Sequence, residues 1–432
     1  MSVVNDLPAE ILGAIFDMVV LPSYFCNMAS AGQPLSTWKM AMRQKLHLVG
    51  VSRAWYLEAR SYLYEEIAIT DVGQVIRLSD SLNRNQNLGP LVRSLVLACY
   101  IGPVDNDRTK ELEIRLLGLF SKLPNLTSFN YVPSRQLLRR AGSDGLGRSQ
   151  LPTRLSNACA ATITQLWLSS PITWEQVAQI LGLLSHRLVS FRLPATHNAG
   201  EGENISFGPN SIDTPFSFRV LETLFVDIDR RSPFTRALVR WDMPALKRLT
   251  VSGGRRQDIR IDSLRSLSAI IRNWPTIQYL NINDGSRTRQ KAPVIADIIY
   301  QLPNLEHLVT QACYLSSFQK PHPRLRWIDV YLDSTSASLT ASLEASLDRK
   351  NFTRFRAIRS ISPQLIDLLL LPFTLHPSSP PGKGCTRSFS AGDVCFEYTS
   401  DGIRAKPTRS SNGYRIREEE SVRVDDDLEA LW

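Results

Sequence analysis

The chain contains 432 residues, of which 43% are hydrophobic and 21% are charged, a composition typical of a globular protein. Its 50 Lys and Arg residues against 41 Asp and Glu residues give a net charge of +9. This excess is dilute and scattered through periodic segments, so it disfavours nucleic-acid binding. Because single cores stop growing beyond about 250–300 residues, the length excludes one compact core. We expect two domains, or one small domain followed by an elongated array.

The first regular segment begins after Leu7 and Pro8 and is predicted to be a helix. A proline suits the first helical turn, where a missing N–H costs nothing. Apolar residues then recur at three- and four-residue steps, which is the period of an amphipathic helix. The apolar residues of this stripe are Ile11, Leu12, Ile15, Phe16 and Val19.

Two further helices are predicted in the first 65 residues, at 38–48 and 52–64. Ser52 suits the N-cap of the second of these, and Trp55, Ala59 and Leu63 line one face. Three short helices bury little surface by themselves, and their apolar faces exceed what one small bundle needs. Part of this surface is therefore expected to contact a partner.

Two motifs stand in series at the N-terminus. LPAEIL at 7–12, with an apolar pair at 15–16, precedes VSRAW at 51–55, which closes with Leu63 and Tyr64. In residue type and order these motifs resemble the F-box family. The resemblance covers about 60 of the 432 residues and implies a three-helix docking module for a Skp-type adaptor, which joins the protein to a cullin-based ubiquitin ligase.

The segment 20–45 is longer than a typical F-box loop. The resemblance therefore does not decide whether the helix at 38–48 is the middle helix of an F-box. A purely structural helical cap on the following domain remains the alternative. Core packing is the more common role for a Trp at helical spacing, so Trp55 is also a candidate for the bundle core. The candidate adaptor-binding residues are Leu7, Pro8, Ile11, Leu12, Ile15, Phe16, Val51 and Trp55.

Beyond residue 90 a short phrase returns about every 29 residues, with amphipathic segments before many of its copies. In each copy an apolar residue is followed by two residues of any type, a second apolar residue, one residue of any type and a last residue that is usually apolar. Pro-containing turns introduce several copies. One strand and one helix per unit resemble a leucine-rich repeat, although the usual Asn or Cys after the strand is missing. A conventional parallel sheet with crossover helices is the alternative. The copies are VRSLVL at 92, LTSFNY at 126, ITQLWL at 163, LVSFRL at 188, LETLFV at 221, LKRLTV at 246, IQYLNI at 277, LEHLVT at 305 and LRWIDV at 325.

In such a solenoid the Leu-type residues of each strand point inward, and the intervening residues form a long concave face. Aromatic and Arg side chains dominate binding hot spots, so this face is a candidate surface for a target protein. For any single residue, an ordinary solvated strand face is the alternative. The candidate target-binding residues are Trp167, Arg192, Phe225, Arg248, Tyr279, Asn281, His307, Trp327 and Tyr331.

Motifs of catalysis and of cofactor binding are missing from the sequence. The six His residues lack metal-ligand spacing, and no Walker loop, G-x-G-x-x-G, G-x-S-x-G or H-E-x-x-H occurs. The six cysteines form no CxxC pair, so neither a zinc site nor a redox motif is expected. Together with the missing nucleotide motifs, this predicts a protein without a cofactor. Asp6 and Glu10 do not fit a secretory signal, and the longest apolar run, 368–373, is too short to span a bilayer. We expect a non-catalytic protein of the cytoplasm or nucleus, without a membrane partner.

The expected fold class is α + α/β, an N-terminal three-helix F-box followed by an irregular leucine-rich-repeat-like solenoid of strand–helix units. The expected domains are the helical unit at 1–70, the solenoid at 71–375, a loop with a candidate last strand at 376–403, and a charged, flexible tail at 404–432. The expected function is a substrate receptor of a Skp–cullin–F-box ubiquitin ligase. A repeat scaffold that binds protein or nucleic acid without a ubiquitin link is the alternative.

Overall fold

A computed structural model of the chain describes sixteen stretches of residues, and every structural statement below concerns these stretches. They are 7–20, 37–99, 107–132, 151–168, 174–193, 215–228, 237–253, 259–284, 289–315, 318, 320, 322–331, 357–361, 387–391, 394–399 and 402–407.

Three helices open the chain, as the sequence predicts: α1 (Ala9–Val19), α2 (Thr37–Val49) and α3 (Arg53–Glu65). Pro8 stands at the N-cap of α1, where its lack of an N–H leaves no bond unmade. The side chain of Ser52 caps α3 by accepting a hydrogen bond from the Trp55 N–H at 3.3 Å, which confirms the predicted start of that helix.

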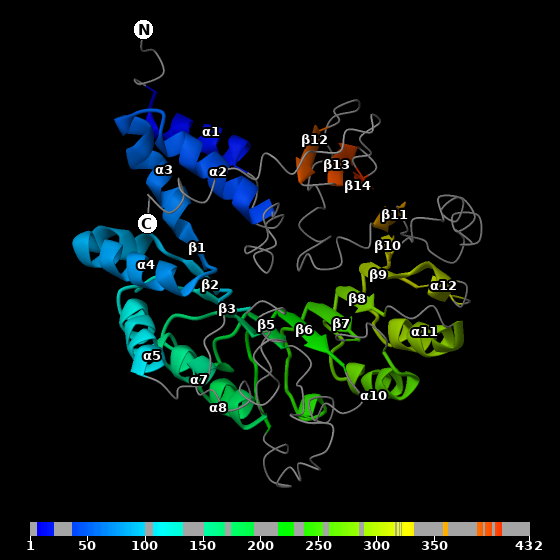
Figure 1. Cartoon of the computed structure of the whole chain (residues 1–432). Helices are drawn as coiled ribbons and strands as arrows, with labels where there is room; N and C mark the ends of the chain where they lie inside the picture. The colour runs from blue at the N-terminus through cyan, green and yellow to red at the C-terminus, as the bar shows by residue number, and fades with distance from the viewer. Residues whose placement is uncertain are drawn as a thin grey trace.

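Eleven parallel strands form one open sheet in which the spatial order equals the chain order (Figure 1). All nine phrases identified in the sequence form strands of this sheet. Consecutive parallel neighbours require a crossover between each pair, which is the arrangement of a solenoid. The strands are β1 (Glu66–Ile69), β2 (Ser94–Leu97), β3 (Ser128–Tyr131), β4 (Gln165–Leu168), β5 (Ser190–Leu193), β6 (Thr223–Asp227), β7 (Arg248–Ser252), β8 (Tyr279–Asn283), β9 (His307–Gln311), β10 (Trp327–Tyr331) and β11 (Ala357–Ile361).

Helices cover the outer side of this arc of strands (Figure 1). Leucine-type residues of strands and helices meet there in one continuous core, in which Leu249, Leu280 and Leu308 are fully buried. The mixed helix–strand architecture and open parallel sheet are therefore those of a leucine-rich-repeat-like solenoid. The elements between the strands are α4 (Val72–Arg84), η4 (Gln86–Leu91), α5 (Asp107–Phe120), α7 (Leu151–Ala158), α8 (Trp174–Leu184), α10 (Ile261–Ile271), η6 (Arg289–Lys291), α11 (Ala292–Tyr300) and α12 (Ala312–Leu315).

A carbonyl fork joins each repeat to the next from β2 to β10, just before the strand begins. The Thr127 carbonyl, for example, accepts hydrogen bonds from two consecutive amides, Thr164 N–H at 2.9 Å and Gln165 N–H at 3.0 Å. Because both amides bind one oxygen, the fork sets where the next strand starts relative to its neighbour. The same fork recurs at the carbonyls of Arg93, Thr164, Val189, Glu222, Lys247, Gln278 and Glu306.

Two boundaries differ from the expected ones. Strand β1 follows α3 without a turn and pairs with β2, so the sheet begins inside the stretch assigned to the helical unit. At the other end, β12 (Arg387–Ala391), β13 (Val394–Thr399) and β14 (Gly402–Pro407) form a small antiparallel sheet, and β14 crosses the expected boundary at 404. The rest of the expected tail lies outside the described residues.

Gly89 lies at a close approach between two neighbouring repeats. A Cβ at this position would collide with the backbone carbonyl oxygen of Lys122 in the next repeat, so the backbone must move to accept it. We expect Gly89→Ala to lower the free energy of unfolding by about 1–3 kcal/mol, measured by urea denaturation. Gly182 on α8 is the matched control, because nothing lies within 4 Å of a Cβ there. Gly182→Ala is expected to raise the free energy of unfolding by about 0.5–1 kcal/mol, and a loss there equal to that of Gly89→Ala would contradict the steric explanation.

Candidate protein-binding surfaces

The predicted target-binding side chains lie on the concave side of the sheet. In β7, Leu249 and Val251 belong to the helix-side core, so Arg248 points to the opposite face. Arg248 aligns with Tyr279, and Tyr279 with His307, across neighbouring strands. The strand register places these candidates in two adjacent rows across the sheet. One row contains Arg248, Tyr279, His307 and Trp327, and the other contains Trp167, Arg192, Phe225 and Asn281.

The predicted target-binding residues differ in how far their side chains are buried. Arg192, Arg248 and Trp327 are half-buried, and the side chain of Tyr331 lies outside the described residues. These three half-buried members are more accessible than the buried ones, and the role of every member of the set in binding stays a prediction. The buried members are Trp167, Phe225, Tyr279, Asn281 and His307, of which His307 is only 1% exposed.

Arg192 is held between two aromatic rings on three neighbouring strands. Its guanidinium carbon lies 4.0 Å from the centroid of the Trp167 ring and 3.8 Å from that of the Phe225 ring. Cation–π contacts of this kind are favourable and fix the direction of the guanidinium. All three residues belong to the predicted target-binding set, but their stacking depends on strand register, which the sequence alone does not reveal.

His307 and Asp329 form a buried pair across β9 and β10. The His307 Nε2 and Asp329 Oδ2 atoms are 2.6 Å apart, and both side chains are 1% exposed. The ring of Tyr279 stands edge-on to the imidazole, with centroids 5.2 Å apart. A polar pair buried in this way supports the structure of the strands, so His307 is not on the open surface that the sequence analysis expected.

Helix α2 covers the first strands on their concave side. Trp38 and Met42 pack with Val96 in a second, smaller apolar cluster. Lys45 Nζ lies 3.7 Å from the Glu66 carboxylate at the start of β1. Burial raises the pKa of Glu66, and the neighbouring Lys45 opposes that rise. Helix α2 thus packs directly on the first strands of the solenoid, and we call this contact the seam.

The core of the helical unit contains part of the predicted adaptor-binding set. Leu12 and Phe16 are buried, and the rings of Phe16 and Trp55 meet edge to face with centroids 5.2 Å apart. Leu7 and Ile15 are partly buried against the same cluster. The expectation is corrected for Leu12 and Phe16, whose side chains face α3 and do not reach the surface.

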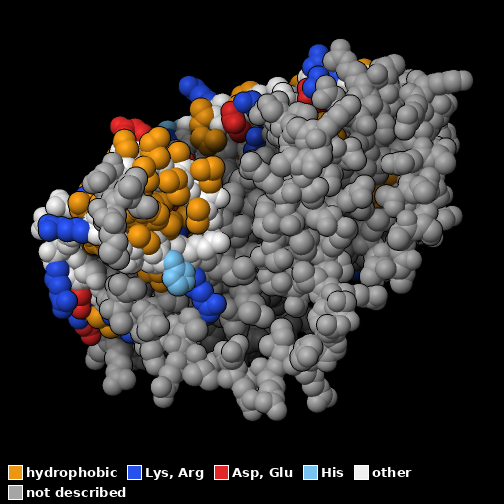
Figure 2. All heavy atoms as spheres, turned by 90° about the horizontal axis from the view of Figure 1, so that it is seen from above, with side chains coloured by type: hydrophobic (Ala, Val, Ile, Leu, Met, Phe, Trp, Pro, Cys, Tyr) orange, Lys and Arg blue, Asp and Glu red, His pale blue; other side chains and the backbone are white. Residues whose placement is uncertain are grey.

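The other face of these helices exposes large apolar side chains. Of the predicted adaptor-binding residues, Ile11 is 49% exposed, Val51 is 55% exposed and Pro8 is also exposed. Figure 2 shows hydrophobic side chains gathered over the N-terminal helices. We call the exposed residues Ile11, Met18, Val19, Val51, Tyr56 and Leu57 the apolar patch. Met18 is not among the predicted residues, although it lies two turns beyond Ile11 on the same face of α1.

Metal binding and thiol chemistry depend on how the His, Cys, Asp and Glu side chains of the described residues are grouped and buried. No group of three or more His, Cys, Asp and Glu side chains there could hold a metal ion. Burial raises the pKa of both Cys99 and Cys159 to about 12, so neither is a thiolate at neutral pH. Among these same residues, no helix combines the length and apolar character needed to cross a membrane.

Comparison with known proteins finds similarity only among solved structures. No protein-family model and no curated protein matches the chain. A leucine-rich-repeat protein of Legionella pneumophila, LegL7, is 14% identical over 69% of this chain and 91% of its own, with a TM-score of 0.37. A chain of the yeast Rad7–Elc1 complex is 12% identical over 85% of this chain and 90% of its own, with a TM-score of 0.38. A Bacteroides fragilis protein is 13% identical over 68% and 73%, with a TM-score of 0.37. The assignment to a repeat solenoid rests on the strand order described above.

Proposed function

We propose that the chain is a substrate receptor of a Skp–cullin–F-box type ubiquitin ligase. In this proposal α1–α3 bind a Skp-type adaptor, and the repeat array binds a target protein. The receptor itself does no chemistry. It raises the local concentration of a target lysine near a separate ubiquitin-conjugating enzyme, and flexible tethering of this kind gives effective concentrations in the millimolar range.

The observation that carries the proposal is the apolar patch on a helical unit whose core is already complete. Leu12 and Phe16 pack in that core with Trp55, and among the described residues the exposed Ile11 and Val51 lie outside this cluster. Contiguous apolar surface of this kind marks a protein contact. The occupant to which we commit is a Skp-type adaptor, because the patch lies on the helices whose residue order resembles the F-box.

The seam between α2 and the sheet supports the same proposal. Trp38 and Met42 pack against the first strands, and Lys45 pairs with Glu66. A bound adaptor would therefore have a defined orientation relative to the concave face. A receptor needs that geometry, because the target must be presented to an enzyme held elsewhere in the assembly.

The test is co-purification with a Skp-type adaptor, followed by an affinity measurement on the double variant Ile11→Glu/Val51→Glu. Two carboxylates in the centre of an apolar interface are expected to weaken adaptor binding by about 100-fold or more, since hot-spot substitutions cost about 2 kcal/mol or more each. Circular dichroism checks that the variant is folded. Point substitution is preferable to deleting the helices, because deletion would expose Val96 at the seam.

Val239→Glu is the matched control, since Val239 is 54% exposed in the repeat array, far from the helical unit. This variant is expected to bind adaptor as the wild type does. If the wild-type chain is folded and binds no adaptor, the ubiquitin-ligase proposal fails. The helices are then a structural cap, and a protein-binding scaffold without a ubiquitin link becomes the better description.

A further inference from the structure

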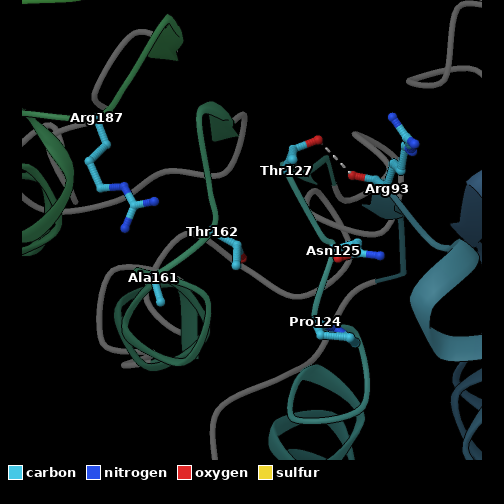
Figure 3. A pocket seen from close by; sticks show the side chains of 7 residues that line it. All are labelled: Arg93, Pro124, Asn125, Thr127, Ala161, Thr162 and Arg187. Atoms are coloured by element: carbon cyan, nitrogen blue, oxygen red, sulfur yellow. Dashed lines mark hydrogen bonds between the residues drawn. The ribbon is translucent and has the colours of Figure 1, made fainter.

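A pocket of about 440 Å³ lies on the rim of the solenoid, where the amino ends of β2 to β5 meet (Figure 3). Arg93 directly precedes β2, and Arg187 lies three residues before β5. Figure 3 shows these two arginines on opposite sides of the pocket, with Thr162 and Asn125 between them. The lining is completed by Pro124, Thr127 and Ala161.

The pocket is basic and has no carboxylate in its lining. The stretches that build this rim, from helix end to strand end, are residues 84–99, 118–132, 157–168 and 185–193, and they contain no Asp or Glu. Neither the Arg93 nor the Arg187 guanidinium makes a hydrogen bond or ion pair with a described residue. Two positive charges therefore line one cavity without an ion pair to a described residue. Glu65, which precedes β1 and whose carbonyl accepts a hydrogen bond from the Arg93 N–H at 2.9 Å, is an acidic neighbour on this rim and does not line the pocket.

Later repeats close the equivalent rim with ion pairs. Lys247 Nζ lies 2.6 Å from Glu222 Oε1, and Arg326 lies 3.6 Å from the Glu306 carboxylate. These residues precede their strands as Arg93 precedes β2. The rim is thus charge-balanced near β6 to β10 and unbalanced near β2 to β5, so the excess charge is a local feature and does not belong to every repeat.

The floor of the pocket is held in place by backbone contacts. The Asn125 amide donates to the Pro90 carbonyl at 2.7 Å, and the Thr127 hydroxyl donates to the Arg93 carbonyl at 3.2 Å. The Thr127 hydroxyl thus uses its donor, and the Asn125 amide uses one of its two N–H donors, on the protein. The two guanidinium groups are the charged donors of the lining, and their planar N–H forks match the oxygens of an oxyanion.

We propose that this pocket binds a phosphate monoester group through Arg93 and Arg187. A phosphate monoester carries a charge of about −1.5 to −2 at neutral pH, which matches two guanidinium groups better than a single carboxylate does. No aromatic side chain lines the pocket, so it offers no stacking platform for the bases of a nucleic acid. The source of the phosphate is either a phosphorylated side chain of a bound protein or a small free phosphate.

Fluorescence anisotropy of the full chain without adaptor tests this proposal independently of the proposed function. The probe is a fluorescein-labelled peptide, Gly-Ala-phosphoserine-Ala-Gly, beside its unphosphorylated form. We expect only the phosphorylated peptide to bind, and Arg93→Gln and Arg187→Gln each to weaken binding by about tenfold or more. Both side chains lack described partners, so these variants are expected to fold, which thermal melting checks.

Arg265→Gln is the control for net charge, because Arg265 is an exposed arginine of α10 distant from the pocket. Unchanged binding in Arg93→Gln and Arg187→Gln, or an equal loss in Arg265→Gln, would overturn the proposal, as would failure of the phosphopeptide and inorganic phosphate alike to bind the wild type. Competition by inorganic phosphate near the Kd of the peptide identifies a free phosphate as sufficient. Competition only at concentrations far above that Kd identifies a protein-borne phosphate.

Discussion

Replacing Asp284 with alanine is expected to lower the free energy of unfolding of the repeat array by about 3–5 kcal/mol. The Asp284 carboxylate is fully buried just after β8 and accepts hydrogen bonds from three groups. They are Lys291 Nζ at 2.9 Å, the Tyr314 hydroxyl at 2.5 Å and the Ile259 backbone N–H at 2.9 Å. Without the carboxylate, the buried ammonium of Lys291 loses this ion pair, and urea denaturation followed by circular dichroism measures the loss.

The double variant Asp284→Ala/Lys291→Met separates the charge from the contacts. Removing both partners leaves no uncompensated ammonium, so the double variant is expected to be more stable than Asp284→Ala alone. A double variant that is less stable than Asp284→Ala would contradict this account. It would mean that the Lys291 ammonium stabilises the interior through contacts other than the one with Asp284.

Replacing Trp274 with alanine is expected to cost about 3–5 kcal/mol of stability, because it leaves a large cavity. Trp274 is 1% exposed and lies in the main core, in the turn between α10 and β8. Its Nε1 has no hydrogen-bond partner among the described residues. The same denaturation measurement applies, and a loss below about 1 kcal/mol would show that the core collapses around the site.

Trp274→Phe is the matched control. It keeps most of the apolar volume and sacrifices no hydrogen bond, so we expect a loss of about 1–2 kcal/mol. A loss as large as that of the alanine variant would show that the indole N–H has a partner after all. The comparison therefore distinguishes cavity formation from loss of a polar contact.

The repeat strands could be predicted from the sequence because each carries its own apolar alternation and is introduced by a turn. Strand β1 is not predicted by the sequence pattern, because Glu66–Ile69 follows α3 directly, with no turn residue to mark the change. The local sequence pattern is sufficient to predict these strands because every repeat buries one face of a strand and one apolar stripe of a helix.

The candidate surfaces were less predictable. The helical period selects Ile11 and Leu12 together, but only packing against α3 decides that Leu12 is buried while Ile11 is exposed. The Asp284–Lys291 pair and the rim pocket depend on residues brought together by strand register and turn geometry. Arg93 and Arg187 are 94 positions apart in the chain, and nothing in either neighbourhood indicates the other.

The carbonyl forks explain how repeats of unequal length share one sheet. Each fork involves only two neighbouring repeats and sits at the amino ends of the strands. The connection after a strand can vary in length, provided that the next strand starts at the fork carbonyl and runs parallel to its neighbour. Phrases spaced from about 20 to 37 residues apart therefore all fit into one sheet. An inserted or duplicated segment that begins and ends at such a carbonyl would therefore change the reach of the arc and leave the spacing between adjacent strands unaltered.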